Sequence, residues 1–171
     1  NYASRIQQSI LPHEDALTAR LPEHFVLWEP RDVVGGDIYW VRPWGSGDLI
    51  MLGDCTGHGV PGAFMTLISS GALDQAYLEI PRGDTARLLQ RMHQIIQESL
   101  GQERKDGASD DGLEVGICYL PGNRQSMVFS GARFSLFVVE DGEVSEIKGD
   151  KSGLGYRGIP HNVQFTNHEV D

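Results

Sequence analysis

The order of hydrophobic patterns along this chain narrows its possible folds more than any other feature. Two helical patterns follow each other directly, at about 61–78 and 85–100, and segments with a period of two residues lie on both sides of them. Gly101 follows the second pattern as a C-cap residue. Strands, then a helix pair, then more strands favour an α+β layered sandwich over a βαβ parallel sheet.

The expected strands are short and bounded by turn residues. We expect them at 25–29, 36–41, 48–54, 113–120, 125–130, 134–140, 143–148 and 161–170. An Asp141-Gly142 turn joins two of them as a hairpin. Residues 49–52 form a continuous apolar run, which is typical of a strand buried on both faces. Residues 102–112 are polar and charged, so we expect a mobile loop there.

Composition excludes several classes of function. With 14 Lys and Arg against 24 Asp and Glu, the 171 residues carry a net charge of −10. Binding to nucleic acid or to an anionic membrane surface needs a basic face, so we expect neither partner. Two cysteines cannot form a disulfide framework, which favours a cytoplasmic location. No apolar run reaches the ~18 residues that a transmembrane helix needs.

The first twelve residues have the pattern of a helix end. Apolar residues recur at a spacing of four, at Tyr2, Ile6 and Ile10, and Pro12 ends the pattern. Because no initiator Met is present, we expect residues 1–12 to be a linker helix from an upstream region. Residues 13–171 would then form one domain. The alternative is a short helix that packs on its own domain.

Two aspartates beside glycines carry the strongest chemical signal. Asp37 lies in VGGDIYW (34–40) and Asp54 lies in GDCTGHGVPG (53–62). They are 17 positions apart across one expected hairpin, so they can meet on neighbouring strands. Two carboxylates in a partly dry site repel each other, and a divalent cation removes that penalty. Oxygen ligands favour Mg²⁺ or Mn²⁺ over Zn²⁺. The alternative is that both motifs are ordinary turns.

Several motifs together resemble a known enzyme family. GGDIYW at 35–40, GDCTGHG at 53–59 and the PGAFM that follows are similar to the 2C-type metal-dependent Ser/Thr protein phosphatases (PPM family), and within them to the bacterial SpoIIE/RsbU-like branch. RIQQSILP at 5–12 resembles the linker that precedes such domains. PRDVVGGD at 30–37 and DGLEVGICYL at 111–120 follow in the family's order. The resemblance covers essentially the whole chain, and it implies a four-layer αββα sandwich of two antiparallel sheets flanked by helix pairs.

The resemblance also implies roles for individual residues. Asp37 matches the first metal-ligating aspartate, Asp54 matches the aspartate that bridges two ions, and the backbone carbonyl of Cys55 would complete a metal site. His58 would act as a general acid or would hold the aspartate loop in place, and the second role is favoured. The implied reaction is hydrolysis of phosphoserine or phosphothreonine by a metal-activated water, with two Mg²⁺ or Mn²⁺ ions in the complete domain.

The implied biology is bacterial signal transduction. The substrate would be a phosphorylated protein of the anti-sigma-factor-antagonist (STAS) type, and an upstream sensor would control the domain. The resemblance also implies a homodimer through the N-terminal helix and a larger, inner-membrane-anchored protein.

The family's further acidic metal motifs, Ser-Asp-Gly and Asp-Asp, are not found after residue 130. We therefore expect the C-terminal part of the domain to be missing from this sequence. Three other acidic residues are expected to be solvated rather than substitute ligands, namely Asp110, Asp111 and Asp150.

Two alternative functions remain. Cys118 and Arg124 have the C-x₅-R spacing of cysteine-dependent phosphatases. However, Pro121 removes a backbone N–H from the anion cradle, and the pattern after Arg124 is that of a strand, not a helix. The second alternative is a catalytically inactive pseudo-phosphatase that keeps the fold and binds a partner. Metal-dependent turnover would distinguish this module from the enzyme.

Overall fold

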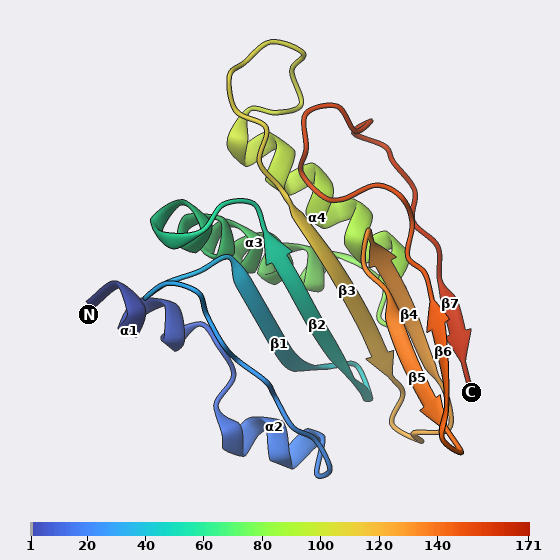
Figure 1. Ribbon diagram of the computed structural model, residues 1–171. Coiled ribbons are helices and arrows are strands. Elements are labelled where there is room, and N and C mark those ends of the chain that lie inside the picture. The colour runs from blue at the N-terminus through green and yellow to red at the C-terminus, as the bar shows by residue number, and fades with distance from the viewer. Residues whose placement is uncertain (1) are drawn as a thin grey trace.

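A five-stranded antiparallel sheet forms the centre of the molecule, in the order β1-β2-β3-β4-β7. The computed structural model describes residues 2–171. The strands of this sheet are β1 (Asp37–Trp44), β2 (Gly47–Cys55), β3 (Leu113–Leu120), β4 (Met127–Ala132) and β7 (His168–Val170). A separate antiparallel hairpin consists of β5 (Leu136–Glu140) and β6 (Glu143–Ile147). The α+β class with two antiparallel sheets is therefore confirmed (Figure 1).

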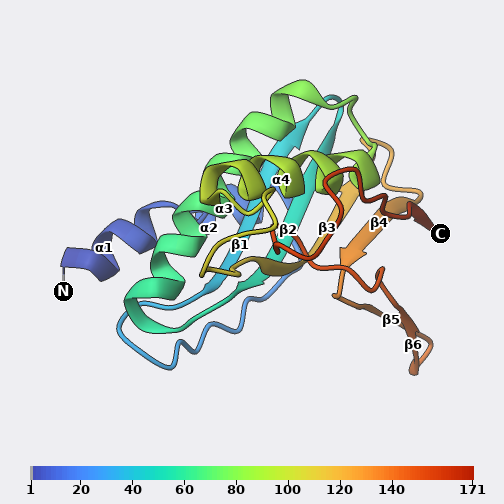
Figure 2. The ribbon, with the colours of Figure 1, turned by 90° about the horizontal axis from the view of Figure 1, so that it is seen from above.

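Two long helices, α3 (Gly59–Glu79) and α4 (Thr85–Leu100), pack together on one face of the large sheet (Figure 2). The Asp84 side chain caps α4 by accepting a hydrogen bond from the backbone N–H of Arg87 at 3.2 Å. Gly101 ends the helix in the left-handed conformation, with φ of 65°, as its position in the sequence predicts. The helix pair at 61–78 and 85–100 is confirmed.

The core lies between this helix pair and the sheet. Side chains alternate along β1 and β2, so Ile38, Leu49 and Met51 point toward the helices and are fully buried. Burial of each such side chain stabilises the fold by roughly 1.5–3 kcal/mol. The expectation that β2 is buried on both faces is wrong, because Leu52 on the opposite face is 49% exposed.

The N-terminal third differs most from expectation. Residues 25–29 form no strand, and Phe25 is 90% exposed, because no neighbouring strand pairs with this segment. A helix that we did not expect, α2 (Glu14–Arg20), lies beside β1. Of the strand expected at 161–170, only β7 pairs with β4.

The first helix, α1 (Tyr2–Ser9), contacts α3. Its buried residue is Gln7, whereas Tyr2 and Ile6 of the predicted apolar stripe are 76% and 42% exposed. Ile10, just after the helix, packs against the core. Within residues 2–171, no helix combines the length and the apolar character needed to cross a bilayer.

Candidate metal centre

Asp37 and Asp54 lie directly opposite each other on β1 and β2. The backbone N–H of Cys55 donates to the carbonyl oxygen of Gly36 at 2.8 Å, so Gly36 and Cys55 form a hydrogen-bonded pair. In an antiparallel sheet the two pair types alternate, so Asp37 and Asp54 form a non-hydrogen-bonded pair, in which side chains approach more closely. Both aspartates are exposed and point away from the helix pair. The register thus places the two carboxylates on neighbouring strands, as the sequence predicts.

The Asp37 carboxyl is perturbed by its surroundings. Partial burial, the charge of Asp54 and a hydrogen bond with Asp54 together raise the pKa of the Asp37 carboxyl. The Cys55 thiol is buried, and burial is the main reason why its pKa rises to about 12, with the charges of Asp54 and Asp37 adding to the effect. This thiol therefore stays protonated at neutral pH. Only the backbone carbonyl of Cys55 is suited to a hard cation.

Glycines bring three backbone segments together around this pair. A Cβ on Gly36 would lie 2.7 Å from the Cys55 carbonyl oxygen and 3.0 Å from that of Gly57. A Cβ on Gly62 would lie 2.8 Å from the same Gly57 oxygen. Gly57 also has a φ of 84°, which L-residues with side chains rarely adopt. The glycines of both motifs thus permit these backbone segments to approach one another closely.

His58 lies at the edge of the centre rather than between the aspartates. It is the N-cap residue of α3, and its Nδ1 is 3.3 Å from Oδ2 of Asp32. Its side chain is 72% exposed. Among the residues described, no hydrogen bond joins His58 to Asp37 or Asp54. A role for Asp32 was not predicted, because nothing in PRD (30–32) alone places this residue beside His58.

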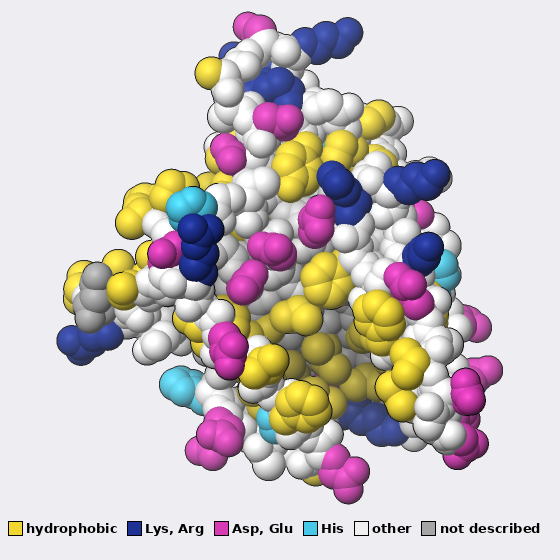
Figure 3. Space-filling model, viewed as in Figure 1, with side chains coloured by type: hydrophobic (Ala, Val, Ile, Leu, Met, Phe, Trp, Pro, Cys, Tyr) yellow, Lys and Arg dark blue, Asp and Glu magenta, His cyan; other side chains and the backbone are white. Residues whose placement is uncertain are grey.

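A third acidic residue, Glu114, continues the row of carboxylates onto β3, where it lies opposite Asp54. Its Oε1 is 3.5 Å from Nε of Arg133, so an ion pair holds it. Figure 3 views this face of the sheet and shows acidic side chains beside an apolar area. Glu114 was not predicted as part of this row, because only the pairing of β3 with β2 brings it here. In the part of the chain that is described, no three His, Cys, Asp or Glu side chains could share one metal ion.

The donor atoms present fit part of a Mg²⁺ or Mn²⁺ site. Two carboxylates and the Cys55 carbonyl supply oxygen atoms alone, the ligands that these ions prefer. A cation between Asp37 and Asp54 would also offset the repulsion that raises the pKa of Asp37. These oxygen atoms are therefore the right kind of ligand for Mg²⁺ or Mn²⁺, but they are too few to complete the coordination of an ion.

The other aspartates considered from the sequence have structural partners instead. Asp110 Oδ1 accepts a hydrogen bond from the backbone N–H of Arg157 at 2.8 Å. Asp111 Oδ1 accepts from the Thr56 hydroxyl at 3.1 Å. The Asp150 carboxylate accepts from both the backbone and the hydroxyl of Thr166. Asp110 is exposed, whereas Asp111 and Asp150 are half-buried, and each of the three carboxylates holds a loop.

The cysteine-dependent alternative is also wrong for this chain. Cys118 lies inside β3, and burial raises the pKa of its thiol to about 12. The guanidinium of Arg124 binds the Asp48 carboxylate, and the chain continues into β4. A protonated thiol and an occupied arginine form no anion-binding cradle.

The chain matches the family described as Stage II sporulation protein E (SpoIIE) over residues 46–171. Among curated proteins, no sequence matches it. Among solved structures, the PP2C domain of SiaA from Pseudomonas aeruginosa is 38% identical, with a TM-score of 0.84. That match covers 99% of this chain and 64% of the SiaA chain. This chain thus spans less than two thirds of the length of that relative.

Two further structures share the fold at lower identity. The PP2C phosphatase domain of SpoIIE from Bacillus subtilis is 16% identical, with a TM-score of 0.57 over 80% of this chain and 37% of that chain. RsbX, solved in complex with magnesium, is 13% identical, with a TM-score of 0.60 over 85% of this chain and 65% of that chain. The family match extends over more than half of the chain and the fold agrees with it, so the chain belongs to the SpoIIE family of PP2C-type protein phosphatase domains.

Proposed function

We propose that this chain hydrolyses phosphoserine or phosphothreonine on a protein with the help of two divalent cations, Mg²⁺ or Mn²⁺. The observation that carries the proposal is the direct opposition of Asp37 and Asp54 in a non-hydrogen-bonded pair, next to the Cys55 carbonyl. In this proposal Asp37 is the first ligand, Asp54 bridges the ions, and Cys55 contributes its carbonyl oxygen. When bound, the ions would lower the pKa of a water molecule and offset negative charge on phosphorus.

The residues around the aspartates support hydrolysis by water rather than by a protein nucleophile. Both cysteine thiols have pKa values raised to about 12, so neither is a thiolate at neutral pH. The carboxylates are exposed on an open face, which leaves room for a phosphorylated segment of a partner protein. His58 would hold the turn between β2 and α3 through Asp32 rather than transfer a proton.

We further propose the setting in which this domain acts. Its substrate would be a phosphorylated STAS-type protein of a bacterial signalling system, as the similarity to the SpoIIE/RsbU branch suggests. Residues 1–12 would connect residues 13–171 to an upstream sensor in a larger, membrane-anchored protein, and the N-terminal helices of two copies would form a dimer. The remaining acidic ligands would lie in a C-terminal extension.

One observation favours a second candidate, a pseudo-phosphatase that only binds its partner. Within residues 2–171, no third His, Cys, Asp or Glu side chain joins the two aspartates to form a metal-binding group. Such a module would bind the phosphoprotein and release no phosphate.

Phosphate release from a phosphoserine STAS-type protein tests the two candidates. We would assay residues 1–171 and a C-terminally extended chain with Mn²⁺, with EDTA, and as Asp37→Asn and Cys118→Ser variants. The proposal expects turnover that EDTA and Asp37→Asn abolish and that Cys118→Ser retains. Turnover only in the extended chain would place the missing ligands there. Partner binding without turnover in both chains would support the pseudo-phosphatase.

A further inference from the structure

The side chain of Gln7 forms a closed pair of hydrogen bonds with the backbone of Gly35. Its Nε2 donates to the Gly35 carbonyl oxygen at 2.6 Å, and the Gly35 N–H donates to its Oε1 at 3.0 Å. The same Nε2 also donates to the Thr66 hydroxyl of α3 at 3.3 Å. One amide group thus joins α1, α3 and the segment that leads into β1.

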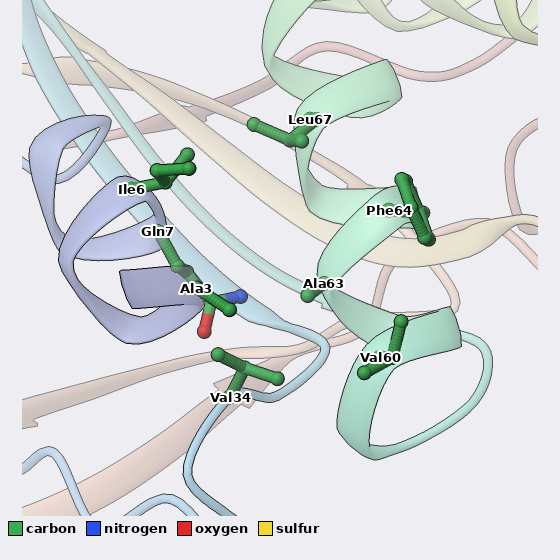
Figure 4. A pocket seen from close by; sticks show the side chains of 8 residues that line it. All are labelled: Ala3, Ile6, Gln7, Val34, Val60, Ala63, Phe64 and Leu67. Carbon is green, nitrogen blue, oxygen red and sulfur yellow. The ribbon is translucent and has the colours of Figure 1, made fainter. Parts of the chain in front are cut away.

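These bonds lie in apolar surroundings. Gln7 is 8% exposed, and it lines a cavity of about 170 Å³ together with side chains of α1 and α3 and with Val34 (Figure 4). Figure 4 shows the amide of Gln7 directed from α1 toward α3. Water competes poorly for a hydrogen bond in such a place, and a buried polar group that loses its partner is costly.

Packing alone does not explain a glutamine at this position. A Met or Leu would fill the contact between α1 and α3 without burying a polar amide, which is unfavourable unless it is hydrogen-bonded. The amide of Gln7 matches both polar groups of the Gly35 backbone, as a neighbouring strand would. The two hydrogen bonds to Gly35 therefore explain why a glutamine occupies position 7.

Gly35 is held just before the candidate metal ligand. Gly36, the next residue, accepts the hydrogen bond from Cys55 at 2.8 Å, and Asp37 begins β1. Gln7 thus fixes one side of this short segment, and β2 fixes the other. Loss of either contact frees the backbone from which the Asp37 carboxylate projects.

We propose that Gln7 is a positioning residue for the metal centre: by holding Gly35, it keeps Asp37 opposite Asp54 and so raises the affinity for Mn²⁺. This inference rests on the proposed function, because it requires the centre to bind the ion. Loss of a partner that orients a metal ligand commonly weakens metal affinity by about 10- to 100-fold.

The test is Mn²⁺ binding to Gln7→Met, measured by titration calorimetry beside hydrogen exchange of the Gly35 amide in metal-free protein. Met keeps the length and the apolar packing of Gln7 and removes both hydrogen-bonding groups. Gln8→Met is the matched control, because Gln8 is the exposed neighbour on the same helix. Leu17→Ala is a second control, since it removes a buried side chain of α2 and destabilises the fold without touching Gly35.

We expect the Kd for Mn²⁺ to rise about tenfold or more in Gln7→Met, with faster exchange of the Gly35 amide, and to stay within about twofold in both controls. Faster exchange with an unchanged Kd would overturn the proposal and leave Gln7 a purely structural residue. An equal rise in Leu17→Ala would overturn it too, because general destabilisation would then explain the effect. Absence of Mn²⁺ binding by the unsubstituted protein would contradict the proposed function, and this role of Gln7 with it.

Discussion

The backbone N–H of Cys55 donates to the carbonyl oxygen of Gly36 at 2.8 Å, and this bond determines how the two aspartates meet. Side chains alternate along a strand, so a slip of one residue in the pairing of β1 with β2 would move one carboxylate to the helix-covered face. With the observed register, Asp37 and Asp54 face each other on the open side of the sheet. The pairing register of β1 with β2 thus creates the candidate metal centre.

The repulsion between the carboxylates predicts that Asp37→Asn stabilises the metal-free protein at neutral pH. Like charges directly opposite on neighbouring strands destabilise a sheet by roughly 0.2–1 kcal/mol, so Tm should rise by about 1–4 °C. Mn²⁺ should raise the Tm of the unsubstituted protein and leave that of Asp37→Asn unchanged. Differential scanning calorimetry measures both effects. Asp141→Asn, in the turn between β5 and β6, is the control and should alter neither.

The same pair predicts a pH dependence. The pKa of Asp37 is raised above its ordinary value of 3.8 in the folded protein, so the folded state binds this proton more tightly than the unfolded state. The contribution of Asp37 to stability is therefore lost as the pH rises from the ordinary pKa through the raised one. The advantage of Asp37→Asn should be absent below this window and complete above it. An advantage that shrinks as the pH rises would contradict the account.

The close approach of two backbone segments predicts a loss of stability at Gly36 and almost no change at the adjacent Gly35. Gly36→Ala places a Cβ 2.7 Å from the Cys55 carbonyl oxygen, which should cost about 1–3 kcal/mol of stability and weaken Mn²⁺ binding. Gly35→Ala places its Cβ in open space, with no atom within 4 Å, and should change stability by less than about 0.5 kcal/mol. Urea unfolding of both variants checks this. Equal losses would show that the close contact does not matter.

Arg124 should contribute to stability and not to catalysis. Its guanidinium binds the buried Asp48 carboxylate, which Arg20 also contacts at 2.5 Å. We expect Arg124→Ala to lower the free energy of unfolding by about 1–2 kcal/mol, because Asp48 keeps one partner. Metal-dependent phosphate release should be retained. The exposed Arg104→Ala is the control for stability, and a loss of turnover in Arg124→Ala alone would revive the cysteine-dependent mechanism.

Local patterns in the sequence were sufficient for most of the helices and strands. The helix at 85–100 was predicted from its regular apolar face, with Gly101 as the capping signal at its C-terminal end; its N-cap, Asp84, was not predicted. The strand at 113–120 and the Asp141-Gly142 turn are also as predicted, and both turn residues have positive φ. In each case the determining interactions lie within a few residues of one another.

Features that depend on distant contacts were not predicted. The apolar residues at 25–29 look like a strand, but β1 is the edge strand of the sheet and no strand pairs with this segment. Glu114 joins the acidic row only because β3 pairs with β2 across a separation of about sixty residues in sequence. Gln7 lies within RIQQSILP, but its role was not predicted, since that role depends on a backbone contact with the distant Gly35.

Calorimetric titration with Mn²⁺ tests the central claim most directly, because it measures ion binding at Asp54 whether or not this chain turns over a substrate. Asp54→Asn removes the proposed bridging ligand, and Glu114→Gln makes the same kind of change one strand further along the row. We predict saturable binding by the unsubstituted chain, its loss in Asp54→Asn, and a Kd within about threefold of the original in Glu114→Gln. Binding that survives in Asp54→Asn, or that is absent from the unsubstituted chain, would contradict the assignment of this pair as the metal centre.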